Sequence, residues 1–438
     1  MIVNLSYINA LKTSAMNNLS GTDWQKNIYV NGFSGAKPLI EVDFEKLEQT
    51  AKTAMTPEAY AYISGGAGSG STMRANRDAF AKYKIVPRML RDVSVRDMSI
   101  TLFGKKLSSP LLLSPVGVLE MVHEQADLAV AKAAAELGMP YIYSNQASKS
   151  MEACAQVSGD SAHWFQLYWS KSNDLVVSFV ERAEKCGCSA IVVTLDTTML
   201  GWRTRDLEIG YLPFMEGKGI AQYTSDPVFQ RLLDEPEVTE QINRKINWQS
   251  VNGLIAMVNN YPGNGFVSKL KSGRPIKAVR KFVSMYSNPA VTWEDLTFLR
   301  KHTKLPILLK GILHADDAQK AIDFGMDGII VSNHGGRQID GSISTLEALP
   351  SIVERINAQL PVLIDSGFRS GADVFKALAL GANAVCIGRP YVYGLAVAGS
   401  AGVYHVLRNL LAEFELTMGL SGCKNISEIK RDRVTPES

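Results

Sequence analysis

The sequence predicts a closed (β/α)8 barrel, and three observations support this fold class. Eight short apolar runs recur along the chain, and each is followed by a turn and helix-like sequence. Small or polar residues stand at the C-terminal end of every run. These residues follow one another at intervals of 22 to 33 residues, with a single exception of 116 residues. Such intervals fit one strand, one helix and their loops.

The predicted strands are apolar throughout, as expected for a parallel sheet that helices cover on both faces. They are PLLLSPV (110–116), MPYIYSN (139–145), HWFQLYW (163–169), AIVVTLD (190–196), PILLKG (306–311), GIIVSN (328–333), PVLIDSG (361–367) and AVCIGRP (384–390). An open doubly wound sheet is the alternative architecture. It usually carries a Gly-rich fingerprint after its first strand, and SGGAGSG (64–70) has its glycines at other spacings.

The long interval between the fourth and fifth runs predicts an insertion at about 210–290. An insertion after a strand lies on the side where barrels build their active sites, so this segment is a candidate lid. Its basic run KLKSGRPIKAVRK (269–281) is interpreted as a solvated face. We therefore expect an N-terminal helical extension with a barrel-closing hairpin (1–106) and a barrel that contains the insertion (107–438).

The composition is that of a soluble globular protein, with 46% hydrophobic and 20% charged residues. A net charge of +3 is too small to indicate a nucleic-acid partner. Five cysteines without zinc-site spacing indicate a reducing compartment, and neither a disulfide framework nor a metal site is expected. The first 18 residues have no basic start or continuous apolar core, and no run reaches transmembrane length. We expect a cytoplasmic protein without a membrane partner.

The stretch VSNHGGRQ (331–338) carries the main catalytic candidate. A buried strand ends here in a Gly-rich turn, after which a helix could begin. His334 and Arg337 would then lie on one side of its first turn, because residues three apart are neighbours on a helix. An imidazole accepts a proton near neutral pH, and a guanidinium binds a carboxylate through two parallel hydrogen bonds. The alternative is a histidine whose ring is satisfied by a backbone carbonyl.

Residues at the ends of the eight runs form a second set of candidates, because the C-terminal rim is where barrels place their active sites. They are Gly117, Ser144, Gln166, Thr194, Lys310, Ser332, Asp365 and Gly388. The last two loops, DSGFRSGAD (365–373) and CIGRP (386–390), predict a phosphate site. Glycines, Arg369, Arg389 and a helix N-terminus with a capping box favour a bound dianion there. The spacing leaves open whether that phosphate belongs to a substrate or to a cofactor.

The stretches SNHGGRQ, DSGFRSGADVFKALALGA and IGRP resemble the FMN-dependent 2-hydroxy-acid oxidising enzymes, a family that includes glycolate oxidase, lactate oxidase and lactate monooxygenase. The resemblance runs from about residue 25 to about residue 430. GWRTRDL (201–207), YTSDPVFQ (223–230), SGGAG, SPVGV and the long insertion are most similar to the lactate 2-monooxygenase branch. The resemblance implies a barrel fold, FMN as the cofactor and a homo-oligomer, either a tetramer or an octamer.

The resemblance also implies roles for residues that would meet the substrate. His334 would act as the base, with Asp196 orienting it. Arg337 and Arg203 would clamp the substrate carboxylate. Tyr62 and Tyr168 would donate hydrogen bonds from their hydroxyl groups.

Lys310 would lie beside the flavin pyrimidine, where an ammonium stabilises the reduced anion. A strand-end lysine also suits a Schiff-base nucleophile, as in barrel aldolases. Val116 and Gly117 stand where the oxidases of this family more commonly have a Thr-Ala pair. Gly117 would leave extra room beside the flavin. The implied cofactor contacts are Pro115, Val116, Gly117, Ser144, Gln166, Thr194, Lys310, Ser332, Asp365, Gly367, Arg369, Gly388 and Arg389.

The implied activity is FMN-dependent oxidation of an L-2-hydroxy acid, foremost L-lactate, with O2 as the second substrate. A lactate 2-monooxygenase would give acetate, CO2 and water. An oxidase or dehydrogenase that gives pyruvate is the first alternative. A barrel lyase that uses Lys310 on a phosphorylated substrate and a non-catalytic flavin-binding homologue are the others.

Overall fold

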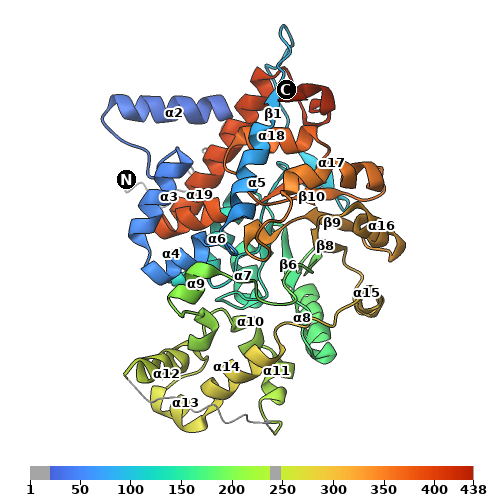
Figure 1. Cartoon of the computed structure of the whole chain (residues 1–438). Coiled ribbons are helices and arrows are strands. Elements are labelled where there is room, and N and C mark those ends of the chain that lie inside the picture. Colours follow the sequence, from blue (N-terminus) through green and yellow to red (C-terminus); the bar gives the residue numbers. More distant parts are fainter. Residues whose placement is uncertain (1–19, 237–247, 438) are drawn as a thin grey trace, which may run out of the picture.

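The computed structural model describes residues 20–236 and 248–437, and a closed barrel of eight parallel strands lies at its centre (Figure 1). The strands are β4 (Leu111–Leu113), β5 (Tyr141–Tyr143), β6 (His163–Leu167), β7 (Ile191–Thr194), β8 (Ile307–Ile312), β9 (Gly328–Val331), β10 (Val362–Ile364) and β11 (Ala384–Ile387). Each strand pairs in parallel with the next, and β11 closes the ring on β4. The predicted fold class is confirmed.

Apolar side chains fill the inside of the barrel. Leu112, Ile142, Trp164 and Val192 belong to one buried cluster with residues of the other strands. A hairpin of β2 (Ile100–Leu102) and β3 (Lys105–Leu107) adds Leu102 and Leu107 to this cluster, and Phe103 lies 5.8 Å from the Trp164 ring. The hairpin therefore packs against the N-terminal end of the barrel, opposite the rim. The division into an N-terminal extension with this hairpin (1–106) and a barrel with its insertion (107–438) stays a prediction.

Helices surround the barrel and bury their apolar faces against it. They are α6 (Ala126–Glu136), α7 (Met151–Ser158), α8 (Asn173–Lys185), α15 (Trp293–Arg300), α16 (Ala315–Asp323), α17 (Thr345–Ile356), α18 (Gly371–Ala379) and α19 (Arg389–Leu420). Helix α19 is interrupted at Ala398 and Gly399, where the backbone leaves helical angles. This arrangement leaves the strand ends at the rim free to carry polar side chains.

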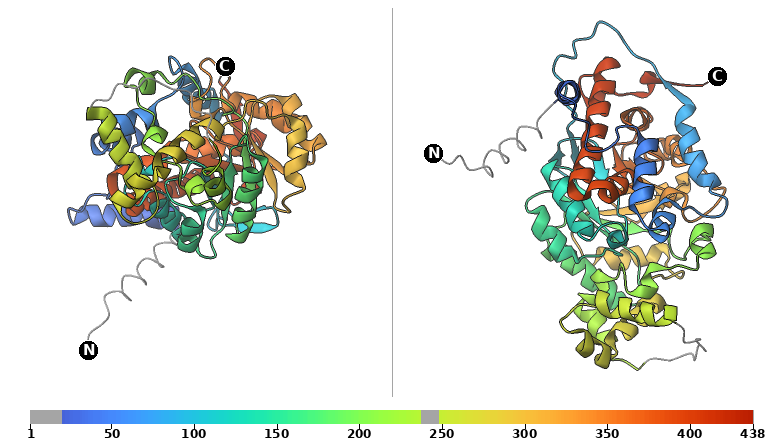
Figure 2. Two further views of the ribbon diagram at one scale, coloured as in Figure 1. Left: turned by 90° about the horizontal axis from the view of Figure 1, so that it is seen from below. Right: turned by 90° about the vertical axis from the view of Figure 1, so that its left-hand side faces the viewer.

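Four helices precede the barrel in the described chain: α2 (Gly21–Phe33), α3 (Phe44–Ala54), α4 (Pro57–Ser64) and α5 (Ser71–Ala81). Figure 2 shows the blue N-terminal helices beside the red helix α19, against which α2 and α3 pack. The short strands β1 (Tyr83–Ile85) and β12 (Val434–Pro436) pair near the C-terminus. The C-terminal end of α4 reaches the barrel mouth, which brings this segment to the candidate site.

The predicted insertion between the fourth and fifth barrel strands is helical where it is described. It forms α9 (Thr204–Glu208), the 3₁₀ turn η2 (Pro213–Glu216), α10 (Ala221–Thr224), α11 (Pro227–Leu232), α12 (Trp248–Asn260), α13 (Phe266–Ser272) and α14 (Arg274–Met285). Helix α9 lies beside α4, whereas α10 to α14 are grouped at one end of the molecule (Figure 1). The basic run divides between α13 and α14 at Gly273, which adopts φ +65°. Helix α14 buries Val279 and Phe282 and leaves Lys277 exposed, as an amphipathic surface helix does.

Among residues 20–236 and 248–437, no helix is long and apolar enough to cross a membrane. In the same residues, no three His, Cys, Asp or Glu side chains gather as metal ligands. All five cysteines are free thiols. The segment 1–18, for which the sequence predicts neither a leader nor a membrane span, lies outside the described residues.

Candidate active site

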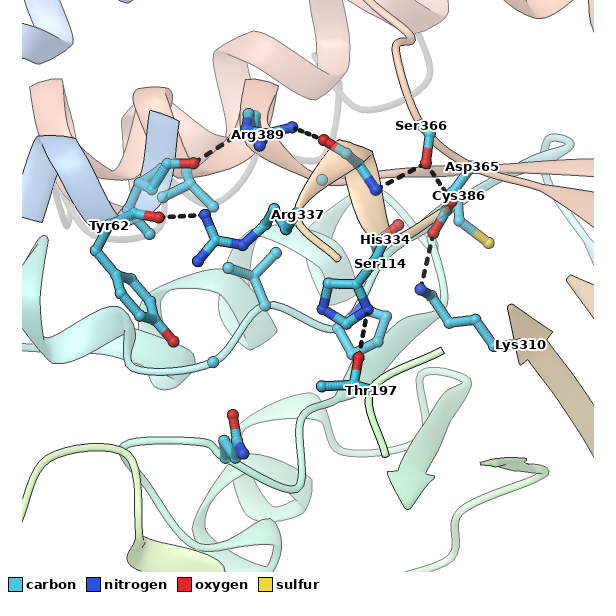
Figure 3. A pocket seen from close by; sticks show the side chains of 18 of the residues that line it. Tyr62, Ser114, Thr197, Lys310, His334, Arg337, Asp365, Ser366, Cys386 and Arg389 are labelled. Carbon is cyan, nitrogen blue, oxygen red and sulfur yellow. Dashed lines mark hydrogen bonds and ion pairs between the residues drawn. The ribbon is translucent and has the colours of Figure 1, made fainter. Parts of the chain in front are cut away.

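A cavity with an empty volume of about 1020 Å³ opens at the C-terminal ends of the barrel strands (Figure 3). All but five of the predicted site residues line it. The predicted residues that line it are Tyr62, Pro115, Val116, Gly117, Tyr168, Arg203, Lys310, His334, Arg337, Asp365, Gly367, Arg369, Gly388 and Arg389. The lining extends from the His334 turn to both predicted phosphate loops, so the cavity can take a ligand that reaches from one to the other.

The five other predicted residues, Ser144, Gln166, Thr194, Asp196 and Ser332, do not line this cavity but are buried or nearly buried behind its wall. Three of them form side-chain hydrogen bonds with lining residues. Ser332 accepts one from Lys310 at 2.9 Å, Asp196 accepts one from His334, and Ser144 accepts one from the backbone N–H of Gln146 at 3.1 Å. Gln166 Oε1 accepts from the backbone N–H of Asn145 at 3.1 Å.

His334 and Asp196 form the central polar pair. Asp196 Oδ1 lies 2.7 Å from His334 Nδ1 and also accepts a hydrogen bond from Thr197 Oγ1 at 2.9 Å. Nδ1 therefore carries the hydrogen of the neutral ring and donates a hydrogen bond to the carboxylate. Nε2 is left without a hydrogen and can accept a proton. Burial lowers the pKa of His334, although Asp196 opposes this effect. The imidazole is neutral at neutral pH.

Asp196 stays ionised behind this imidazole. Burial alone would raise the pKa of Asp196, but His334 and Lys310 outweigh that effect and hold the pKa at about 2. The carboxylate is therefore available at every physiological pH to orient the ring and to stabilise a proton taken up on Nε2.

The backbone around His334 differs from the predicted helical turn. His334, Gly335 and Gly336 all adopt left-handed angles, with φ of 56°, 66° and 75°, in the short 3₁₀ turn η3 (His334–Gly336). The helix begins only at α17, which Ser344 caps. The predicted helix, whose first turn would hold His334 and Arg337, does not form here, because a left-handed series of residues cannot continue an α-helix. The turn nevertheless directs His334 and Arg337 into one cavity.

Two guanidinium groups face the cavity beside the imidazole. Arg337 Nη1 donates to the carbonyl oxygens of Tyr62 and, at 3.0 Å, of Gly65, and its guanidinium lies 4.9 Å from the Tyr62 ring (Figure 3). Arg203 Nε donates to the carbonyl of Arg337 at 3.4 Å. Within the described residues, neither arginine forms an ion pair with a carboxylate. Burial, and then the charge of Arg203, lower the pKa of Arg337 to about 9. Arg203 is buried and Arg337 is partly buried, and two neighbouring cations that repel each other favour a bound anion.

Lys310 lies on the opposite side of His334, between two carboxylates. Its Nζ lies 3.2 Å from Asp365 Oδ2 and 3.9 Å from Asp196 Oδ2. Burial would lower the pKa of Lys310, but Asp365 and Asp196 outweigh it and raise the pKa well above its ordinary value. The side chain is therefore an ammonium. A Schiff-base nucleophile must be a free amine, so this position does not favour the lyase alternative.

The far end of the cavity holds the predicted phosphate loops. Ser370 and Asp373 form the expected capping box at the start of α18. The Arg369 guanidinium stacks 4.2 Å from the Phe44 ring, and burial together with Arg389 lowers the pKa of Arg369 to about 10. Gly367 has φ +88°, and a Cβ there would lie 2.7 Å from the Asn76 carbonyl oxygen, so only glycine fits.

Arg389 connects this end of the cavity with the catalytic candidates. Its guanidinium donates to the carbonyl oxygens of Ile63 at 3.0 Å, Gly335 at 2.9 Å and Gly65 at 2.8 Å. Among the described residues, it has no carboxylate partner. Arg389 therefore retains its charge for an anion while it ties the end of α4 to the His334 turn.

Several buried polar atoms near the rim have no hydrogen-bond partner among the described residues: Ser114 Oγ, Asn145 Nδ2, Gln166 Nε2 and Thr194 Oγ1. Ser114 lines the cavity, and the other three residues lie directly behind its wall. Because buried polar groups are normally satisfied, these atoms indicate a polar ligand on this side of the cavity. Both donors and acceptors are present, and an isoalloxazine ring offers both. The residues therefore fit the flavin and the phosphate that the resemblance implies.

Other lining residues were missed by the sequence analysis: Gln146, Thr197, Leu200, Phe214, Tyr286, Ser366 and Cys386. Gln146 and Thr197 stand one or two residues beyond predicted positions, so the rim pattern contained a signal for them. Phe214 and Tyr286 come from the insertion, where no strand period marks them. Their rings lie 5.9 Å apart, and the two residues together form an aromatic wall of the cavity.

The chain matches the FMN-dependent dehydrogenase family over residues 51–436. It is 42% identical over 395 residues to an L-lactate oxidase of Lysinibacillus sphaericus, covering 90% of this chain and 93% of that protein. It is 41% identical over 412 residues to the FMN-dependent alpha-hydroxy acid dehydrogenase qulF of Penicillium citrinum, covering 93% and 94%. A crystal structure of mandelate oxidase superposes with a TM-score of 0.72 at 34% identity, covering 91% of this chain and 98% of the other.

Proposed function

The chain belongs to the FMN-dependent dehydrogenase family, and we propose that it converts L-lactate and O2 into acetate, CO2 and water as a lactate 2-monooxygenase. The broader activity is common to its relatives: the chain is an FMN-dependent oxidoreductase of 2-hydroxy acids. The choice of lactate and the fate of oxygen are the proposal.

One observation carries the proposed chemistry: the neutral imidazole of His334 and the guanidinium groups of Arg337 and Arg203 converge on one cavity. Neither arginine has a carboxylate partner among the described residues. Arg337 and Arg203 bind the carboxylate of the 2-hydroxy acid and fix its orientation. His334 Nε2 takes the proton that leaves the substrate, and Asp196 stabilises the resulting imidazolium.

The tyrosines complete the substrate site. Tyr168 is 8% exposed and Tyr62 7% exposed, and both line the cavity. Burial raises the pKa of Tyr168 above its ordinary value, so its hydroxyl remains protonated and acts as a hydrogen-bond donor. Two tyrosine hydroxyl groups beside two arginines suit a substrate that carries several oxygen atoms.

FMN would be held by residues at two ends of the cavity. When bound, it would take up the two electrons that leave the α-carbon of the substrate and pass them to oxygen. Arg369, Arg389 and the N-terminus of α18 would hold its phosphate. Gln166 and Thr194 would meet the ring with their unpartnered polar atoms. The Lys310 ammonium would stabilise negative charge near the ring.

The aromatic wall supports a small substrate and the monooxygenase outcome. Phe214 and Tyr286 line the cavity with two bulky rings, which suits a substrate with a side chain as small as the methyl group of lactate. A closed mouth retains pyruvate beside hydrogen peroxide, which attacks the keto carbon. Pyruvate and peroxide then give acetate, CO2 and water.

Lactate oxidase is the second candidate, and the 42% identity with a lactate oxidase favours it. In that case pyruvate and hydrogen peroxide leave the site separately. A dehydrogenase would reduce another acceptor in place of O2. The three outcomes share the same substrate chemistry and differ in what happens after lactate is oxidised.

The decisive experiment mixes the purified flavoprotein with L-lactate in air and assays acetate, pyruvate and peroxide together. Acetate without free peroxide supports the proposal, and pyruvate with equimolar peroxide supports the oxidase. A flavin that lactate bleaches and that stays reduced in air, with no peroxide, no acetate and no more pyruvate than flavin, indicates a dehydrogenase.

A His334→Ala variant tests the assignment of the base. It should retain bound flavin and lose reduction by lactate by a factor of roughly 10² to 10⁴, the usual contribution of general base catalysis. Rapid flavin reduction in this variant would remove His334 from that role.

A further inference from the structure

Gln338 makes three hydrogen bonds that connect the two halves of the candidate site. Its side-chain oxygen accepts from Arg203 Nη2 at 3.1 Å. Its side-chain nitrogen donates to the carbonyl oxygens of Asp196 at 2.8 Å and Met199 at 2.9 Å. Both hydrogens of the amide are used, so the orientation of the group is fixed and its oxygen must face Arg203.

These bonds fasten the segment 196–203 to the turn that carries His334. The segment begins with the carboxylate that orients the imidazole and ends with the arginine that faces the cavity. The two backbones are in direct contact, since a Cβ on Gly201 would lie 2.6 Å from the Arg337 carbonyl oxygen and 2.7 Å from that of Gln338. Gln338 is therefore the side-chain connection across a tight backbone contact.

A neutral amide suits Arg203 better than a carboxylate would. A glutamate at position 338 would form an ion pair with Arg203 and compensate the charge that the cavity offers to an anion. It would also place negative charge against the carbonyl oxygens of Asp196 and Met199. Gln338 accepts one hydrogen bond from Arg203 and does not neutralise the positive charge of the guanidinium. Nη1 of Arg203 has no partner among the described residues and can donate to a bound carboxylate.

We propose that Gln338 is a positioning residue that holds Arg203 toward the substrate and sets the preference of the site for a carboxylate over an uncharged group. This inference rests on the proposed function, because it takes the substrate to be a 2-hydroxy acid. Gln338 would thus influence which substrate binds, although it does not itself line the cavity.

The test compares L-lactate with L-lactamide, which has the same shape and no charge. Anaerobic reduction of the flavin gives the limiting rate and the apparent dissociation constant for each compound. In Gln338→Glu, the ratio of reduction efficiency for lactate over lactamide should fall roughly tenfold or more, the scale of one hydrogen bond to a charged group. Gln338→Met, which frees Arg203 without adding charge, should weaken lactate binding by a smaller factor.

Gln359→Glu is the matched control, because it adds the same charge at an exposed position before β10, at the opposite end of the barrel. It should leave the ratio unchanged. An equal loss for lactate and lactamide in Gln338→Glu, or wild-type ratios in both Gln338 variants, would overturn the inference.

A second readout separates this inference from the proposed function. Calorimetric titration with pyruvate measures carboxylate binding without turnover, and its dissociation constant should rise roughly tenfold in Gln338→Glu. If neither lactate nor lactamide reduces the wild-type flavin, the proposed function fails. The pyruvate titration then still decides the role of Gln338, since unchanged binding in the variant refutes it.

Discussion

The charged residues at the barrel mouth depend on one another. Lys310 is 4% exposed, and its ammonium loses most of its hydration on burial. Asp365 at 3.2 Å and Asp196 at 3.9 Å compensate for that loss, and Ser332 accepts one further hydrogen bond. Removal of one member leaves its partners buried without compensation, which is the costly way to break such a network.

Lys310→Met is expected to slow flavin reduction by lactate by roughly 10²-fold, because the ammonium that stabilises developing negative charge is lost. Anaerobic stopped-flow absorbance measures this rate. Lys320→Met, at an exposed lysine of α16, is the control and should behave as the wild type. An unchanged rate in Lys310→Met would show that its charge does not act on the reaction.

The pH dependence of flavin reduction should follow His334. Its neutral form accepts the proton, so the limiting rate is full above the pKa of His334 and falls as the pH drops through it. Because burial lowers this pKa, the half-maximal rate is expected below pH 6.5. The measurement is a series of anaerobic reductions by lactate across the acid range. A rate that rises toward low pH would contradict a neutral imidazole base.

At the scale of single elements, the capping box of α18 joins helix stability to the predicted phosphate site. Ser370→Ala removes the side-chain acceptor for the Asp373 N–H and should lower the free energy of unfolding by about 1 kcal/mol. It should also weaken FMN binding, because the loop from Gly367 to Ser370 loses its fixed shape. Titration of the apoprotein with FMN measures the second effect.

Ser344→Ala provides the matched control for this prediction. Ser344 forms the same kind of capping box at the start of α17, with Glu347 as its partner, and neither residue lines the cavity. A similar loss of stability is expected, with little change in FMN affinity. An equal loss of FMN affinity in both variants would mean that the N-terminus of α18 does not contribute specifically to phosphate binding.

The elements show how far the sequence could predict the fold and the site. Fully buried strands are apolar at every position, so the eight runs were visible, and the polar residue that ends each run marked the rim. The turn at His334 was not predictable from helical spacing, because a non-glycine residue with φ of 56° is held there by tertiary contacts. Phe214 and Tyr286 lie in an insertion whose packing no local periodicity encodes.

Across the whole molecule, segments distant in sequence enclose the mouth from two sides. The end of α4 brings Tyr62, whose carbonyl and those of its neighbours accept hydrogen bonds from Arg337 and Arg389. The insertion brings Phe214 and Tyr286 from the other side. Enclosure of the cavity therefore depends on how firmly the insertion is attached to the barrel.

Glu120 makes one of these attachments. It lies in the 3₁₀ turn after β4 (η1, Leu119–Met121), and its Oε1 accepts a hydrogen bond from the backbone N–H of Gly219 in the insertion at 2.7 Å. The contact is close, because a Cβ on Gly219 would lie 2.6 Å from a methyl group of Val118. The segment 213–224, which includes Phe214, is thus held against the barrel rim next to Gly117.

Glu120→Ala should loosen this attachment and let pyruvate and peroxide escape before they react. If the monooxygenase proposal holds, free peroxide per lactate consumed should rise by up to roughly tenfold, the factor that corresponds to about 1.4 kcal/mol. Glu120→Gln keeps an oxygen that accepts the Gly219 N–H, so its ratio of acetate to pyruvate should stay near that of the wild type. A shift of equal size in both variants would point to the charge of Glu120, and an unchanged ratio in Glu120→Ala would show that this contact does not control product retention.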